Sequence, residues 1–223
     1  MGAMNSKSRN DCRTMLAHFH NRFLSPQSQE IQNSIQLQIL WHTACTTLFI
    51  DIDLLERAVG REGSKCSSEE HDILMTWAKS DDAQRCVIHG LMIKKYVEEA
   101  TCMSEPAMHV PRALFWASLA IFCFVRYRPR DSSSSKKTRS SSLTSPAAAE
   151  GFHHSHHLGQ DLTGPDGQAS LHDFNTLTAN NASLLKTALF AMTDLLRHVG
   201  HWEIGRKFAA IMTALCNFEF ENP

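Results

Sequence analysis

The sequence lacks the short motifs that identify most catalytic and metal-binding sites. Its 223 residues contain no Gly-x-Ser-x-Gly nucleophile elbow, no phosphate-binding loop and no clean metal-ligand motif. A Cys-x-x-Cys pair is absent as well, so the chain carries neither a two-cysteine two-histidine zinc finger nor a six-cysteine cluster. We therefore expect a regulatory module rather than an enzyme, with no catalytic residue, no bound metal and no cofactor.

An excess of charge and a long apolar run are also lacking. The 22 basic and 23 acidic residues leave a net charge of −1, which gives no electrostatic footprint for nucleic acid or an anionic membrane. The most apolar run, residues 113–125, is shorter than the roughly 20 residues that cross a bilayer. The seven cysteines are an odd number and lie mostly among apolar residues, which favours buried thiols in a reducing compartment.

What the sequence does have is helical periodicity. Apolar residues recur at three- and four-residue spacing, while sustained period-two alternation and internal repeats are absent. We expect an all-α fold, a single bundle of about seven helices. The segments expected to be helical are 11–23, 28–59, a short helix opened by a capping box at Ser67 and Glu70, 81–100, 111–127, 184–199 and one holding residues 204–215.

One segment interrupts this pattern. Residues 128–167 are rich in Ser, Lys, Arg, Gly, Pro and His and poor in large apolar side chains, so they cannot offset the entropy of ordering. About 55 residues follow, too few for a separate core. We expect one helical domain over 11–223, with a long disordered insertion at about 128–167. Residues 1–4 are expected to be a cloning remnant, although Gly2 and Ser6 also fit a myristoylation signal.

The end of the long 28–59 segment places charges beside its apolar stripe. Glu56, Arg57 and Arg61 lie there, and Gly60 suits the left-handed residue that ends many helices. Two interpretations are open: Glu56 reaches an arginine inside the bundle, with Arg206 as the candidate, or these charges form a solvated helix end. A buried pair would specify the arrangement of helices more than it would stabilise them.

The densest histidine cluster raises a metal hypothesis. It comprises His153, His154, His156 and His157, and imidazole binds zinc, nickel and copper. The cluster lies in the Ser- and Gly-rich segment, without the fixed ligands and supporting hydrogen bonds of a structural zinc site. We therefore interpret it as an incidental His-rich linker.

A second histidine pattern supplies the enzyme alternative. His71-Asp72, with His42 about 30 residues earlier, resembles the HD-type metal-dependent phosphohydrolases, which are all-helical. Asp173 or Asp194 would be the late carboxylate ligand. The match covers two residues in a polar first turn of a helix, where acidic residues also favour the helix dipole. A structural dimerisation bundle is the other alternative.

Two separated stretches together resemble one family. The first reads LWH at residues 40–42 and ERAVGREG at 56–63, and the second reads LLRHVGHWEIGRKF at 195–208. They resemble the regulatory domain, or middle homology region, of fungal-specific transcription factors, of the kind that carries two-cysteine two-histidine zinc fingers. The resemblance covers most of residues 30–216 and excludes the insertion.

The resemblance implies an effector- or partner-sensing domain of a nuclear transcription regulator, which alternatively shuttles with the cytoplasm. DNA binding would reside in zinc fingers elsewhere in the full protein, so no direct contact of this chain with nucleic acid is expected, and none with a membrane. The expected partners are other domains of the full-length factor or co-regulators. A homodimer through an apolar helix face at residues 184–199 is a further candidate.

Four tryptophans lie among the predicted helices, and a helical bundle can leave a cavity between its members. If a small apolar effector exists, we expect it near Trp41, His42, Cys45 and Trp116. The alternative is that these four residues form densely packed core.

Overall fold

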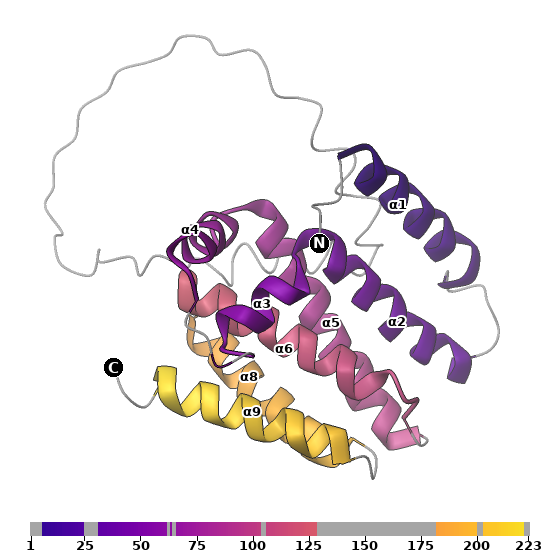
Figure 1. The fold of residues 1–223 in the computed structure, drawn as a ribbon. Coiled ribbons are helices and arrows are strands. Elements are labelled where there is room, and N and C mark those ends of the chain that lie inside the picture. Colours follow the sequence, from indigo (N-terminus) through magenta and orange to yellow (C-terminus); the bar gives the residue numbers. More distant parts are fainter. Residues whose placement is uncertain are drawn as a thin grey trace, which may run out of the picture.

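The computed structural model describes residues 6–24, 31–61, 63, 66–103, 106–128, 182–199 and 203–220. The predicted cloning remnant, the histidine cluster and nearly all of the predicted insertion lie outside these ranges. Within them the chain is all-helical, as predicted, and no strand occurs (Figure 1). The elements are α1 (Ser6–Phe19), the π-helical turn η1 (His20–Leu24), α2 (Ile31–Phe49), α3 (Ile52–Ala58), α4 (Ser68–Trp77), α5 (Asp81–Met103), α6 (Val110–Tyr127), α8 (Ala182–His198) and α9 (Glu203–Phe220).

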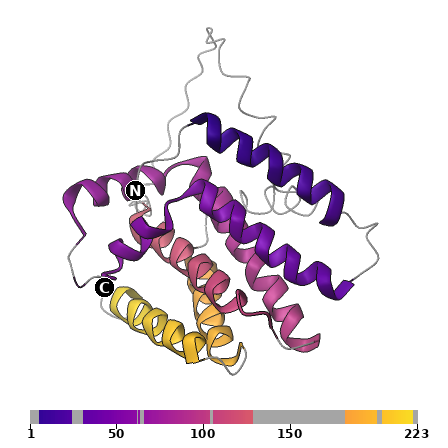
Figure 2. The ribbon, with the colours of Figure 1, turned by 45° about the vertical axis from the view of Figure 1, so that its right-hand side comes forward.

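Helix α6 is the centre of the bundle because it is apolar on nearly every face. It contacts α2, α3, α4, α5, α8 and α9. Both views of the ribbon place α1 beside α2 on one side and α9 on the opposite side (Figures 1 and 2). Among the described residues α6 alone is long and apolar enough to cross a membrane, and 78% of it is buried inside the protein. Its apolar surface therefore packs against the other helices.

The predicted long helix over 28–59 is wrong in one respect, because the structure divides it into α2 and α3. Asp51 adopts an extended backbone conformation, and its carboxylate accepts a hydrogen bond from the amide of Asp53, which caps α3. The indole N–H of Trp77 donates to the carbonyl of Phe49 at the end of α2, 3.1 Å away. These two contacts satisfy backbone groups that the break exposes.

Three predicted helix signals are confirmed. The capping box is present at α4, where the side chain of Ser67 accepts from the amide of Glu70 and the Glu70 carboxylate accepts from the amide of Ser67. Pro111 lies in the first turn of α6, where its missing N–H costs nothing. Gly60, just past α3, has a φ of 89°, a value that disfavours any residue with a side chain.

The hairpin of α8 and α9 packs along α6. Gly205 allows this close approach, because a Cβ atom at that position would lie 2.8 Å from the carbonyl oxygen of Leu196 on α8. The rings of Phe115 on α6 and Phe208 on α9 stack with centroids 4.2 Å apart and an interplanar angle of 5°. The pairing fixes one face of α9 toward the centre of the bundle.

Candidate functional site

A groove of about 1090 Å³ lies where the α2–α3 junction, α6 and α9 meet. We call it the α3–α6–α9 groove. Its volume is slightly above the roughly 300–1,000 Å³ typical of small-molecule sites, and it is partly open to solvent. Arg9 of α1 also reaches its edge.

One wall of the α3–α6–α9 groove is an apolar stripe on α9. It consists of Ile204, Phe208, Ile211 and Leu215, spaced so that all four share one helix face. Ile204 and Ile211 remain 41% and 43% exposed, although both are large apolar residues. Ile204 and Ile211 are therefore left uncovered among the described residues, whereas Phe208 and Leu215 are partly buried against the core and Met212 on the same helix is fully buried.

The floor of the groove carries a small polar cluster. The indole N–H of Trp116 on α6 donates to Oε1 of Glu56 on α3, 3.1 Å away. Oε2 of the same carboxylate pairs with the guanidinium of Arg61 at 2.6 Å, and Arg61 also binds Asp53 at 3.0 Å. The Glu56 side chain is 18% exposed and that of Arg61 53%. The ion pair is therefore neither buried inside the bundle nor part of a fully solvated helix end, the two arrangements considered from the sequence.

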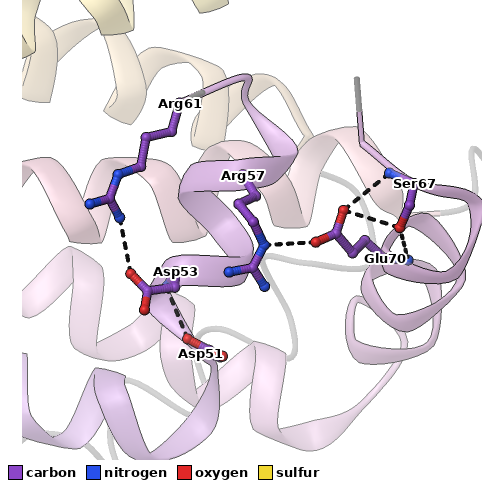
Figure 3. Close-up of polar contacts among 6 residues, drawn as sticks. All are labelled: Asp51, Asp53, Arg57, Arg61, Ser67 and Glu70. Carbon is purple, nitrogen blue, oxygen red and sulfur yellow. Dashed lines mark hydrogen bonds and ion pairs between the residues drawn. The ribbon is translucent and has the colours of Figure 1, made fainter. Parts of the chain in front are cut away.

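The predicted ion-pair residues thus find different partners from those expected. Glu56 binds Arg61 and Trp116, whereas Arg206 is exposed on α9 and does not line the groove. Arg57 pairs with Glu70 of α4 at 2.7 Å (Figure 3). The partner expected for Glu56 was an arginine inside the bundle, whereas the observed partner, Arg61, lies a little over one helical turn from Glu56 in the chain.

Figure 3 shows how α3 is attached to α4. Glu70 accepts from Arg57 through one oxygen and from Ser67 through the other. The hydrogen bond from Arg57, followed by that from the Ser67 backbone, lowers the pKa of the Glu70 carboxyl below its ordinary value. The same bond raises the pKa of Arg57. The ion pair between the charged forms of Glu70 and Arg57 therefore holds α3 to α4.

Two arginines at the groove have no carboxylate partner within the described ranges. They are Arg9 on α1 and Arg112 on α6. The guanidinium of Arg112 lies over the ring of Trp116, 5.7 Å from its centroid. The groove thus combines an apolar wall with cationic groups at its edge.

Of the four residues predicted to surround an effector, the structure places only Trp116 at the groove. Trp41, His42 and Cys45 lie together on α2, facing α1 and α5, and all three are buried. The indole N–H of Trp41 donates to the carbonyl of Leu16 on α1, 2.9 Å away. Burial raises the pKa of the Cys45 thiol well above its ordinary value, so this thiol is protonated and poorly nucleophilic.

His42 faces His89, a residue that no motif in the sequence singles out. Its Nδ1 lies 2.8 Å from Nδ1 of His89 on α5, so one imidazole must donate and the other accept. Burial, and then the neighbouring charges led by His89, lower the pKa of His42. Burial lowers the pKa of His89 to about 3. Both rings are therefore neutral near pH 7, packed among Trp41 and Phe49.

The residues of the HD-type alternative are not assembled in the structure. His71 and Asp72 are exposed on α4, and the His71 ring lies against Tyr127 rather than near His42. Asp194 on α8 lies beside Arg197 and His198. Asp173 lies outside the described residues, among which no group of three or more His, Cys, Asp or Glu side chains forms a metal site.

Sequence reasoning missed the residues that give the groove its polarity, Asp53 and Arg112. Arg112 precedes Trp116 by four residues, a spacing that places both on one face of a helix, so this signal was available. The exposure of Ile204 and Ile211 on α9 could not be predicted from the sequence either. Periodicity shows which residues share a helix face but not whether another element covers that face.

The chain matches no protein-family model, no curated protein and no solved structure. The resemblance to fungal-specific transcription factors therefore rests on the two motif stretches themselves.

Proposed function

We propose that this chain is the effector- or partner-sensing domain of a fungal transcription factor, and that the α3–α6–α9 groove is its sensing site. The observation that carries the proposal is the meeting of the two motif stretches at this groove. Glu56, Gly60 and Arg61 of the first stretch line it, and so do Ile204 and Phe208 of the second. Residues almost 150 positions apart in the sequence thus contribute to one surface.

The geometry suits a sensor because one side of the groove is a small element. Helix α3 has only seven residues: Leu54, Leu55 and Ala58 pack into the core, and polar contacts of Glu56 with Trp116 and of Arg57 with Glu70 join it to α6 and α4. An occupant that binds one position of α3 more tightly than another shifts the population toward that position. Binding in the groove is thereby converted into a change in the surface that α3 presents to other domains or co-regulators.

A transcription reporter tests this proposal. The whole chain is fused to an unrelated DNA-binding domain in a yeast cell, and reporter output is compared with that of the DNA-binding domain alone. We expect the chain to change the output, and Ile211→Glu to alter that change because it puts a charge into the apolar wall. Ile73→Glu on α4 is the matched control, since Ile73 is 47% exposed and lies outside the groove.

The proposal fails if the fused chain leaves reporter output unchanged, or if both variants behave alike. Circular dichroism of each purified variant shows whether it is folded before the comparison is made.

Self-association is a second candidate function, favoured by exposed apolar residues on α8. Leu184 is 48% exposed and Phe190 46%, within the segment predicted to present such a face. Light scattering of the purified chain measures its molar mass in solution. A dimer that Phe190→Glu converts to monomer supports this role, whereas a monomeric wild-type chain contradicts it.

A further inference from the structure

We infer that the α3–α6–α9 groove binds a carboxylic acid with an apolar tail, with the carboxylate at Arg112 and the tail along the α9 stripe. The inference rests on the proposed function of the groove and extends it by naming the chemical class of the occupant.

The charges at the groove favour an anion. Its three carboxylates already have partners: Asp51 caps α3, while Asp53 and Glu56 bind Arg61. Asp51 and Asp53 also lie at the N-terminus of α3, where the helix dipole stabilises negative charge. By contrast, Arg9 and Arg112 lack a carboxylate partner in the part of the chain that is described. The charged groups without a partner are therefore cations.

Arg112 is positioned to receive a carboxylate. It lies in the first turn of α6, where the helix dipole is positive. Its guanidinium lies over the Trp116 ring and pairs with no carboxylate among the described residues, and two parallel guanidinium N–H groups match the two oxygens of a carboxylate. Arg61 is a weaker candidate because it is already bound to Asp53 and Glu56.

The remainder of the groove requires an apolar tail. The stripe from Ile204 to Leu215 extends about 16 Å along α9, at 1.5 Å of rise per residue. Phe115, stacked on Phe208, continues this surface onto α6. An apolar chain covering Ile204 and Ile211 would remove exposed apolar surface from water, whereas a hydrophilic acid such as a sugar phosphate would leave it exposed.

Three probes with the same ten-carbon chain and different head groups test the inference by isothermal titration calorimetry: decanoate, decan-1-ol and decyltrimethylammonium. We expect decanoate to bind roughly tenfold more tightly than decan-1-ol, the gain of a charge-assisted hydrogen bond, and the cation to bind most weakly. Arg112→Gln should remove the preference of decanoate over decan-1-ol and leave decan-1-ol binding unchanged. Arg206→Gln is the matched control, an exposed arginine outside the groove, and should retain the preference.

The inference is overturned if decan-1-ol binds as tightly as decanoate, if Arg112→Gln keeps the preference, or if none of the three probes binds. The proposed function fails separately. If Ile211→Glu changes reporter output while the carboxylate preference is missing, the groove is a sensing site for another chemical class. If decanoate binds as expected but Ile211→Glu leaves reporter output unchanged, the site is real and the regulatory role is wrong.

Discussion

The indole N–H of Trp116 donates to Oε1 of Glu56, and this single hydrogen bond joins α6 to α3 across the floor of the α3–α6–α9 groove. Both atoms belong to side chains that the sequence marked as candidates, but for different reasons. Trp116 was predicted to line an effector site, and Glu56 to form an ion pair. In the structure the two side chains are hydrogen-bonded to each other, so Trp116 of the central helix α6 helps to position α3.

Trp116→Phe tests the strength of this connection. Phenylalanine keeps most of the apolar contact but removes the donor, so the change should lower the free energy of unfolding by roughly 1.5–3 kcal/mol, the usual range for hydrogen bonds to charged groups. Urea denaturation measures the difference. A loss below about 0.5 kcal/mol would show that the bond does not hold α3.

Glu56→Gln separates the ion pair from the hydrogen bond. The glutamine oxygen can still accept from Trp116, whereas the charge that Arg61 binds is lost. Because Arg61 is about half exposed, we expect a loss of at most about 1 kcal/mol. A loss of 3 kcal/mol or more in the same urea experiment would instead indicate a buried ion pair.

Gly205→Ala tests the close approach of α8 and α9. The added methyl would lie 2.8 Å from a backbone oxygen on α8, which cannot move without shifting that helix. We expect a loss of about 1–3 kcal/mol, as for other overpacked sites. Gly90→Ala in α5 is the control, since its nearest neighbour is the flexible end of Ile121 at 3.2 Å, and alanine favours the helix. Equal losses in thermal unfolding would contradict this account.

The His42–His89 pair predicts a pH dependence of stability. Above about pH 6.5 both imidazoles are neutral in the folded and the unfolded chain, so the pair contributes no pH dependence. Below about pH 6.5 the histidines of the unfolded chain become protonated, whereas His89 in the folded chain stays neutral down to about pH 3. The free energy of unfolding should therefore fall by roughly 1.4 kcal/mol per pH unit for each histidine.

Carboxylates titrate in part of the same window, so the measurement compares slopes. Urea denaturation between pH 6.5 and 4 should give a smaller slope for His89→Leu than for the wild type, whatever the two absolute stabilities are. Should that variant be unfolded, His89→Gln gives the same comparison. Identical slopes would show that the pair is protonated in the folded chain or open to solvent.

Cysteine labelling distinguishes the interior cluster from a reactive site. Cys45 and Cys86 are fully buried, and burial raises the pKa of each thiol. Iodoacetamide should therefore alkylate Cys12 and Cys66, which are partly exposed, long before these two. Peptide mapping by mass spectrometry gives the rate at each position. Rapid labelling of Cys45 in the folded chain would mean that the space around Trp41 and His42 is accessible, as a ligand site there would require.

Helix positions were largely predictable from the sequence because caps and periodicity are local. Ser67 with Glu70 located the start of α4, and Pro111 that of α6, within a residue or two. The break at Asp51 was harder to place, since it depends on Trp77, which lies 26 residues further along the chain and caps the end of α2. Such a contact exists only once the bundle has formed.

The candidate site was predictable only in part, for the same reason. Trp41 and Trp116 both lie in apolar helical stripes, and nothing local distinguishes the one that packs under α1 from the one that borders a groove. The difference lies in what covers each face, which is a property of the packed helices. The partner of His42 was likewise hidden, because His89 lies 47 residues away on another helix.

Whether the α3–α6–α9 groove is a binding site can be decided by a thermal-shift screen of apolar metabolites. A ligand present at one hundred times its dissociation constant should stabilise the folded chain by about 2.7 kcal/mol, which raises Tm by roughly 5–10 °C for a chain of this size. We expect at least one compound to produce such a shift in the wild type and in Ile73→Glu but not in Ile211→Glu. Finding no stabilising compound, or one that stabilises Ile211→Glu as strongly as the wild type, would contradict that expectation.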